Sequence, residues 1–283
     1  MILKSFSRMV KERLIYRPYF TTKDVKIGKN VSFGKNVIFN CKRVRIGDGV
    51  IFQDNITINS DVYEIGDYGT IYNHCFFPGP GSLVIGHNFW LGTSSIIDSQ
   101  GETEIGSNVG IGAHSQLWGH MIFGDVMYGS RFHSIKKLTI EDDVWLVGHC
   151  LVSPVRIGKR SVVLLGSLIT KDIEADRVYA GVPARDITDK VGPPFKITPV
   201  QERVHYLEQR LQEFLRAYGL NGMEHKVKIV TKKEDMSSMD KDITILNAAD
   251  RTYTKIGTEL EFKLIRFLLP DAKFVPVNPP GHD

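Results

Sequence analysis

The sequence predicts a mainly β protein built on a parallel β-helix, in which stacked coils form a triangular prism. An isoleucine followed by glycine or glutamate recurs at a near-constant interval, and an apolar residue returns about every six positions in between. Six residues on each of three sides make one coil, and parallel strands stacked coil on coil bury a continuous aliphatic column. The recurring isoleucines are Ile27, Ile46, Ile65, Ile85, Ile105, Ile140 and Ile157.

An antiparallel β-sandwich is the alternative, because it also has short strands at regular spacing with glycine at the turns. A sandwich would contain two-residue hairpin turns of the Asn-Gly or Asp-Gly type. The repeat contains one such pair, Asp48 and Gly49, and its period is close to six rather than two. The spacing therefore favours the β-helix.

Composition limits the classes of function. The chain has 283 residues, 42% of them hydrophobic and 24% charged, which is typical of a soluble protein with an adequate core. The net charge of +4 is already present in residues 1–20, so we expect no broad basic face and no nucleic-acid partner. Three widely spaced cysteines and the lack of a long apolar run predict a cytoplasmic location, with the inner face of the membrane as the alternative.

The first segment, residues 1–20, is expected to be an amphipathic helix. Apolar residues recur there at three- and four-residue spacing, at Leu3, Phe6, Val10 and Leu14, with basic residues between them. Such a helix caps the open end of a repeat stack or makes a peripheral contact with an anionic membrane surface.

Three further segments follow. Residues 21–190 are the predicted β-helix, with a loop at about 119–137, and residues 191–222 are a linker and an amphipathic helix. A capping box at Thr198 with Pro199 in the first turn predicts where that helix begins, and Gly219 predicts where it ends. Residues 223–283 are a small α+β module, with strands expected at 226–231, 242–246 and 273–277 and a helix at 258–269.

The loop interrupts the repeat. The isoleucines before it are 19 or 20 residues apart, whereas Ile105 and Ile140 are 35 apart. The excess of about 15 residues contains His120 and His133, and a histidine-bearing loop on a regular scaffold is a typical way to build a site.

The end of the repeat resembles the closing segment of the hexapeptide-repeat acyltransferases that use acetyl-CoA. Four ordered stretches carry the resemblance, which covers about residues 25–188. They are residues 140–148, 157–162, 166–172 and 179–185. The resemblance implies left-handed coils, acetyl-CoA as co-substrate, no metal, and a homotrimer with sites between subunits.

The same resemblance implies a histidine general base, because a neutral alcohol needs a base to accept its proton as it attacks a thioester. His120 lies 25 residues before Trp145, close to the spacing in the sugar acetyltransferases, so we favour it over His133, which lies 12 before. Superposing the coils that begin at Ile85 and Ile105 stacks residues 98–100 beneath residues 118–120. Asp98 is therefore a candidate partner of the imidazole or the acceptor, the alternative being an aspartate that accepts from a corner amide.

The acetyl-CoA groove is also assigned by resemblance. Lys171 and Arg185 would meet the phosphates, Trp145 would lie near the acetyl end or serve as a wall, and His149 is a further candidate for the pantetheine channel. The positions that would line the groove are Gly148, Gly166, Ser167, Thr170, Lys171 and Arg185.

The predicted function is an acetyl-CoA-dependent O-acetyltransferase acting on a hydroxyl of a sugar or polysaccharide precursor. The alternatives are an N-acetyltransferase acting on an amino sugar nucleotide and a non-catalytic β-helix scaffold. A zinc hydratase on the same prism would need three histidine ligands, typically with two of them separated by four residues. His114 and His120 have five residues between them, which disfavours that class.

Overall fold

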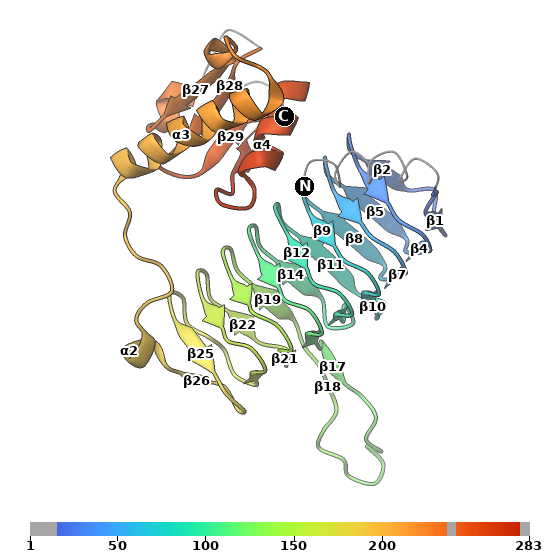
Figure 1. Ribbon diagram of the computed structural model, residues 1–283. Coiled ribbons are helices and arrows are strands. Elements are labelled where there is room, and N and C mark those ends of the chain that lie inside the picture. The colour runs from blue at the N-terminus through green and yellow to red at the C-terminus, as the bar shows by residue number, and fades with distance from the viewer. Residues whose placement is uncertain (1–15, 237–241, 278–283) are drawn as a thin grey trace. The chain divides into compact units, whose positions relative to one another are not determined.

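The computed structural model describes residues 16–236 and 242–277, which belong to two compact units (Figure 1). The first unit ends at Phe195 and the second begins at Lys196. Of the helix expected over residues 1–20, residues 1–15 lie outside the described part of the chain. Its last two residues, Tyr19–Phe20, are instead a strand of the first unit. Among the described residues, no helix has both the length and the apolar character that crossing a membrane requires.

Most strands of the first unit lie in three sheets, which we call faces A, B and C, and two further strands form a separate hairpin. Face A is β1 (Tyr19–Phe20), β4 (Val37–Asn40), β7 (Ile56–Asn59), β10 (Phe76–Phe77), β13 (Ile96–Ile97), β16 (Gln116–Leu117), β21 (Leu151–Val152) and β24 (Leu168–Ile169). Face B is β2 (Val25–Ile27), β5 (Arg43–Ile46), β8 (Val62–Ile65), β11 (Ser82–Ile85), β14 (Thr103–Ile105), β19 (Leu138–Ile140) and β22 (Arg156–Ile157). Face C is β3 (Ser32–Phe33), β6 (Ile51–Phe52), β9 (Thr70–Ile71), β12 (Trp90–Leu91), β15 (Gly110–Ile111), β20 (Trp145–Leu146), β23 (Val162–Val163), β25 (Val178–Ala180) and β26 (Arg185–Asp186).

Successive coils stack in parallel register, as the isoleucine spacing predicts. Ile65 pairs with Ile85 and Ile85 with Ile105, and the next rung joins Ile105 to Ile140 across the longer gap. The extra residues therefore leave the stack intact and project from it (Figure 1). The predicted fold class, mainly β with a parallel β-helix, is confirmed.

The corners use residues that accept a left-handed backbone. The corner between faces C and A has positive φ at Asn55, His74, Ser94, His114 and His149. Asparagine and histidine tolerate this conformation better than most side chains, which explains why polar residues recur at one position of the repeat.

A second corner, between faces B and C, is held by side chains that accept from backbone amides of the preceding coil. Asp67 accepts from the amide of Asp48 at 2.7 Å, and Asp142 accepts from that of Ser107 at 2.6 Å. The latter bond crosses the 35-residue gap, so the insertion leaves this ladder unbroken.

The core differs from the aliphatic column expected from the repeat. In the first coils it is aromatic: Phe20 stacks on Phe39 with ring centroids 4.8 Å apart, and Tyr63 packs edge-on against Phe39 and Phe77 at 5.7 and 6.1 Å. From Ile97 to Val178 the buried hydrophobic residues are aliphatic apart from Cys150. The repeat fixes which positions point inward but accepts rings there, because large flat side chains can stack along the axis.

The three faces differ in their exposed side chains. Face B carries ion pairs between neighbouring coils, among them Arg45 with Asp24 at 2.6 Å and Arg43 with Glu64 at 2.8 Å. Faces A and C carry exposed apolar side chains at corresponding positions, including Phe76 and Leu151 on face A. The short helix α2 (Thr188–Val191) follows the last strands of the prism.

In its described residues, the second unit is a four-stranded sheet with two α-helices and two short 3₁₀-helices. Its elements are α3 (Val200–Tyr218), η1 (Glu224–Lys226), β27 (Val227–Val230), η2 (Lys233–Met236), β28 (Thr244–Asn247), β29 (Thr252–Thr254), α4 (Glu259–Leu268) and β30 (Val275–Val277). The strands lie in sequence order, and only the β28–β29 pair is antiparallel. Phe214 of α3 packs against Phe267 of α4 with centroids 5.6 Å apart.

The start of α3 corrects the predicted capping box. Pro199 rather than Thr198 occupies the N-cap position, and no side chain caps the helix. Arg203 donates to the Thr198 carbonyl at 3.1 Å and to the Ala249 carbonyl at 3.0 Å, which fixes the chain before the helix by a longer-range contact. The predicted end at Gly219 is confirmed, since its φ of 66° is left-handed.

Candidate active site

Asp98 is the buried anchor of the candidate site. It follows β13 at the corner between faces A and B and has no exposed surface. Its Oδ2 accepts from the backbone amide of Gly119 at 2.8 Å, and its Oδ1 accepts from that of Gln100 at 3.1 Å. A buried carboxylate is tolerated when donors compensate for lost water, and these amides are two of them.

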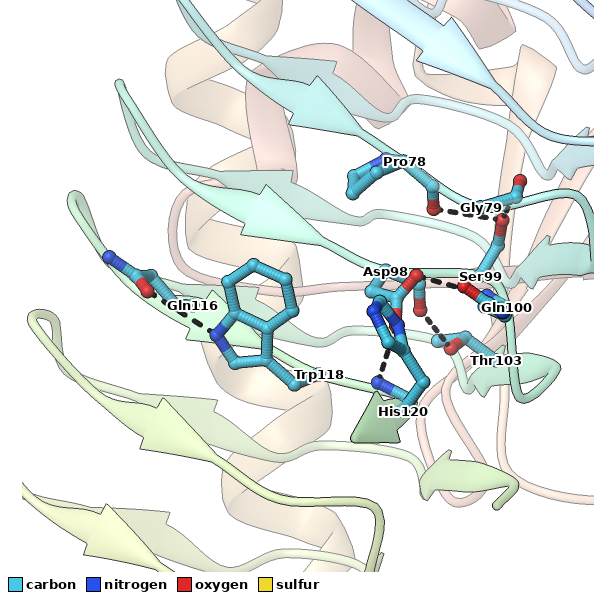
Figure 2. A network of polar contacts seen from close by, with 10 residues as sticks. Pro78, Gly79, Asp98, Ser99, Gln100, Thr103, Gln116, Trp118 and His120 are labelled. Atoms are coloured by element: carbon cyan, nitrogen blue, oxygen red, sulfur yellow. Dashed lines mark hydrogen bonds and ion pairs between the residues drawn. The ribbon is translucent and has the colours of Figure 1, made fainter. Parts of the chain in front are cut away.

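His120 supplies the third donor. Its Nδ1 lies 2.6 Å from Asp98 Oδ2, and its side chain is 24% exposed (Figure 2). An ionised carboxylate can only accept, so the proton of this bond lies on Nδ1. In the neutral imidazole with its proton on Nδ1, the other ring nitrogen, Nε2, carries a free lone pair on the side away from Asp98.

The ring of Trp118, two residues before His120, packs against the imidazole. The two rings meet edge-on with centroids 6.0 Å apart, and the indole Nε1 donates to Gln116 Oε1 at 3.3 Å (Figure 2). No role was predicted for Trp118, which lies just before the predicted loop. The sequence signal that could have indicated a role is the occurrence of a tryptophan two residues before a histidine at a coil corner.

Two hydroxyl residues fix the turn that holds Asp98. Ser99 Oγ donates to the Gly79 carbonyl at 2.7 Å, and Thr103 Oγ1 donates to the Asp98 carbonyl at 2.8 Å (Figure 2). Both side chains are fully buried. They restrict the backbone on either side of the carboxylate, so its position is set by the rigid coil rather than by the loop.

The inserted loop is a hairpin whose base is ordered by the prism. β17 (His120–Met121) pairs antiparallel with β18 (Ser134–Ile135), and the Lys136 amide donates to the Gly119 carbonyl at 3.0 Å. A Cβ at Gly101 would lie 1.9 Å from the Lys136 carbonyl oxygen, so only glycine fits beneath the returning strand.

The other histidine of the loop, His133, is exposed and directly precedes β18. Between the two strands the loop exposes several apolar side chains. They are Phe123, Val126, Met127, Tyr128 and Phe132.

The residues assigned to the acetyl-CoA groove lie at two corners. Gly148 and Gly166 are stacked at the corner between faces C and A, joined by a 3.0 Å backbone bond, and Trp145 is half-exposed on face C just before it. A Cβ at Gly166 would meet nothing within 4 Å, so this corner is open. The rings of His114 and His149 lie at the same corner with centroids 4.9 Å apart.

The remaining groove residues lie elsewhere. Thr170 and Lys171 are exposed at the corner between faces A and B, further along the same edge as His120. Arg185 is exposed in β26. Ser167 is buried, and its hydroxyl donates to the Leu164 carbonyl at 2.7 Å, so it supports the backbone of the corner.

The site centres on an imidazole and a buried carboxylate. Within the described ranges, no three His, Cys, Asp or Glu side chains come together in a way that could hold a metal ion. What the geometry provides is an imidazole with one nitrogen tied to a buried carboxylate and the other free to accept a proton.

Comparison with known proteins adds a family resemblance. No protein-family model matches the sequence. The chain is 31% identical to galactoside O-acetyltransferase of Escherichia coli over 128 residues, which are 44% of this chain and 63% of that protein. It is 53% identical to galactoside O-acetyltransferase of Lactococcus lactis over 49 residues, 17% of this chain and 24% of that protein. The chain resembles the hexapeptide-repeat acyltransferases.

The resemblance to the hexapeptide-repeat acyltransferases has a limited extent. The chain spans less than two thirds of the length of these curated relatives. Among solved structures, AntD of Bacillus cereus, an N-acyltransferase in complex with dTDP-4-amino-4,6-dideoxyglucose and coenzyme A, matches 72% of this chain and 96% of its own at 18% identity, with a TM-score of 0.43.

Proposed function

We propose that the protein is an acetyl-CoA-dependent O-acetyltransferase that acetylates a hydroxyl of a sugar or polysaccharide precursor. The observation that carries the proposal is the 2.6 Å contact between His120 Nδ1 and the buried carboxylate of Asp98. The similarity to galactoside O-acetyltransferases supports the reaction class and the sugar acceptor.

In the proposed reaction, His120 is the general base and Asp98 is the residue that positions it. Nε2 takes the proton of the acceptor hydroxyl as its oxygen attacks the thioester carbonyl. The tetrahedral intermediate collapses with cleavage of the carbon–sulfur bond, and the imidazolium returns the proton to the departing thiolate. Asp98 holds the tautomer and stabilises the cation that forms in between.

A homotrimer with sites between subunits is part of the proposal. Gly148 and Gly166 lie on one edge of face A, and His120 and Lys171 lie on the other. Five residues of extended chain, about 16 Å, separate the edges. A thioester held at the open corner would therefore meet the histidine of a second copy more readily than that of its own chain.

The apolar face A supports the same assembly. Its outward positions form one column through the parallel register, and most of them are apolar. The apolar members of the column are Tyr19, Ile38, Phe76, Ile96, Leu151 and Leu168. Burying such a face against a second copy removes it from water.

The role of His120 is tested by thiol release from acetyl-CoA with galactosides, free sugars and nucleotide-linked amino sugars as acceptors. We expect His120→Ala to lose at least about a hundredfold in kcat/KM, because a positioned base contributes that much. His133→Ala and the matched exposed-histidine control His205→Ala should retain wild-type activity. An equal loss in His133→Ala, or none in His120→Ala, would overturn the assignment.

Two measurements separate the alternatives. An acetyl ester on the product is released by mild alkali, whereas the amide formed by an N-acetyltransferase is not. If the protein is a scaffold without an acetyl-CoA site, millimolar acetyl-CoA will leave the melting temperature unchanged. A functional site predicts a rise of about 2–4 °C, because ligand binding stabilises the folded state.

A further inference from the structure

Face C carries an aromatic strip that runs along the prism toward the open corner at Gly148. Thr70, Trp90, Gly110 and Trp145 are paired in register on four successive strands, so their outward positions form one column. Trp90 is 40% exposed and Trp145 is 51% exposed. Large exposed rings on a rigid sheet are more typical of a binding surface than of a solvated face.

The glycine of this column, Gly110, leaves room for the indole of Trp145. A Cβ at Gly110 would lie 3.4 Å from Trp145 Cδ1 and 4.0 Å from its Nε1, so the indole leans over the strand between the two tryptophans. On the other side, the ring of Tyr72 packs against Trp90 with centroids 5.2 Å apart. We call Tyr72, Trp90 and Trp145 the aromatic strip. Its two tryptophans are two rungs apart, about 10 Å.

The strip has no charge of its own. The other residues of the same column are Ser32, Ile51, Thr70, Gly110, Val162 and Val178, none of which ionises. Face B, by contrast, is covered by ion pairs. A phosphorylated or polyanionic ligand is recognised by arginine and lysine, which this column lacks. The surface suits a neutral ligand with flat apolar faces and polar edges.

A sugar ring has that chemistry, because its axial C–H groups form an apolar face and its hydroxyls lie at the rim. Rings held on stacked strands are already in place before binding, so little conformational entropy is lost when a chain of sugars packs along them. The strip ends at Trp145, three residues before the open corner at Gly148. A glycan lying on it would be led toward the acetyl donor.

We propose that the aromatic strip binds a neutral glycan chain that lies along the prism axis. The acceptor is then the end of an oligosaccharide or polysaccharide rather than a free monosaccharide. This inference deepens the proposed function and rests on it for the identity of the transferred group.

Binding is tested on the full chain without acetyl-CoA, by calorimetric titration with neutral hexasaccharides of glucose and galactose in α1,4 and β1,4 linkage. We expect at least one to bind, and Trp90→Ala and Tyr72→Ala each to weaken binding about tenfold or more. Trp90→Phe keeps a ring and should retain most of the affinity. The matched control Phe195→Ala removes an exposed ring that lies outside the strands of faces A and C and should bind like the wild type.

Three results would overturn the inference: no binding of any hexasaccharide, equal affinity in the wild type and both alanine variants, or a smaller oligomer in light scattering of Trp90→Ala. The last would make the strip a contact between copies. Because no acetyl-CoA is present, failure of the proposed transfer reaction leaves this test intact. If the protein acetylates monosaccharides but binds no glycan, glycan binding by the aromatic strip is refuted while the proposed function stands.

Discussion

The first coils of the prism and the coils that carry the site bury polar groups in different ways. Tyr63 is fully buried among aromatic rings, and its hydroxyl has no hydrogen-bond partner among the described residues. Asp98 is equally buried, yet its carboxylate is met by two backbone amides and by His120. An unpaired hydroxyl costs little beside the burial of its ring, whereas an unpaired charge would not be tolerated.

This difference separates what the two regions contribute. Burial raises the pKa of Tyr63 well above its usual value, so its hydroxyl stays neutral and serves packing alone. In the coils at Asp98, the hydrogen bonds hold one carboxylate and one imidazole in place. Stability should therefore be lost most easily in the first region and activity in the second.

The largest loss of stability is expected from Phe39→Ala. Phe39 contacts Phe20, Phe52 and Tyr63, so its removal opens a cavity that neighbouring rings cannot fill. The free energy of unfolding should fall by about 4 kcal/mol in urea titration. Folded molecules should keep their acetyl-transfer activity, because the site lies several coils away. A loss of activity without a loss of stability would contradict the division between the regions.

A smaller loss of stability with a larger loss of activity is expected from Asp98→Ala. The variant leaves the amides of Gly119 and Gln100 without their acceptor, at a cost of about 2–3 kcal/mol, and releases the imidazole. Asp98→Asn should restore much of the stability but little of the transfer rate. The control Glu104→Ala removes an exposed ion pair with Lys137 and should change stability by under about 1 kcal/mol. Full activity in Asp98→Asn would show that the carboxylate does not position His120.

The smallest effect is expected from Tyr63→Phe, and it is a gain. Removing a buried hydroxyl that lacks a partner should raise the free energy of unfolding by about 1 kcal/mol and leave activity unchanged. Matched urea titrations of the wild type and the variant measure the change. Destabilisation would mean that the hydroxyl contributes to the core.

The contact between the two central residues of the site could be anticipated from sequence because the repeat fixes the register. Inward isoleucines place each coil on the next, so residues 98–100 had to stack beneath residues 118–120. The diagonal reach of His120 to Asp98 could not be predicted, since it depends on where the chain leaves the coil at Gly119. The supporting bonds of Ser99 and Trp118 likewise depend on side-chain directions that spacing does not encode.

Other features escaped prediction for reasons of tertiary packing. The repeat marks inward positions but not what fills them, so the rings around Tyr63 were not foreseen. Local capping rules placed the start of α3 at Thr198, whereas a contact of Arg203 with Ala249 in a distant turn governs that end of the helix. The strand β29 is three residues long and pairs on both sides, which a short local pattern cannot reveal.

The bond from the Ser107 amide to Asp142 has a consequence for how such a prism can change over evolution. It closes a 35-residue segment where its neighbours in the ladder close 19 or 20. The entropy of closing the longer segment adds only about 0.5 kcal/mol. An insertion at a corner of the coil therefore costs little free energy of folding. The hairpin can lengthen, shorten or be exchanged for another while the carboxylate beneath it keeps its position.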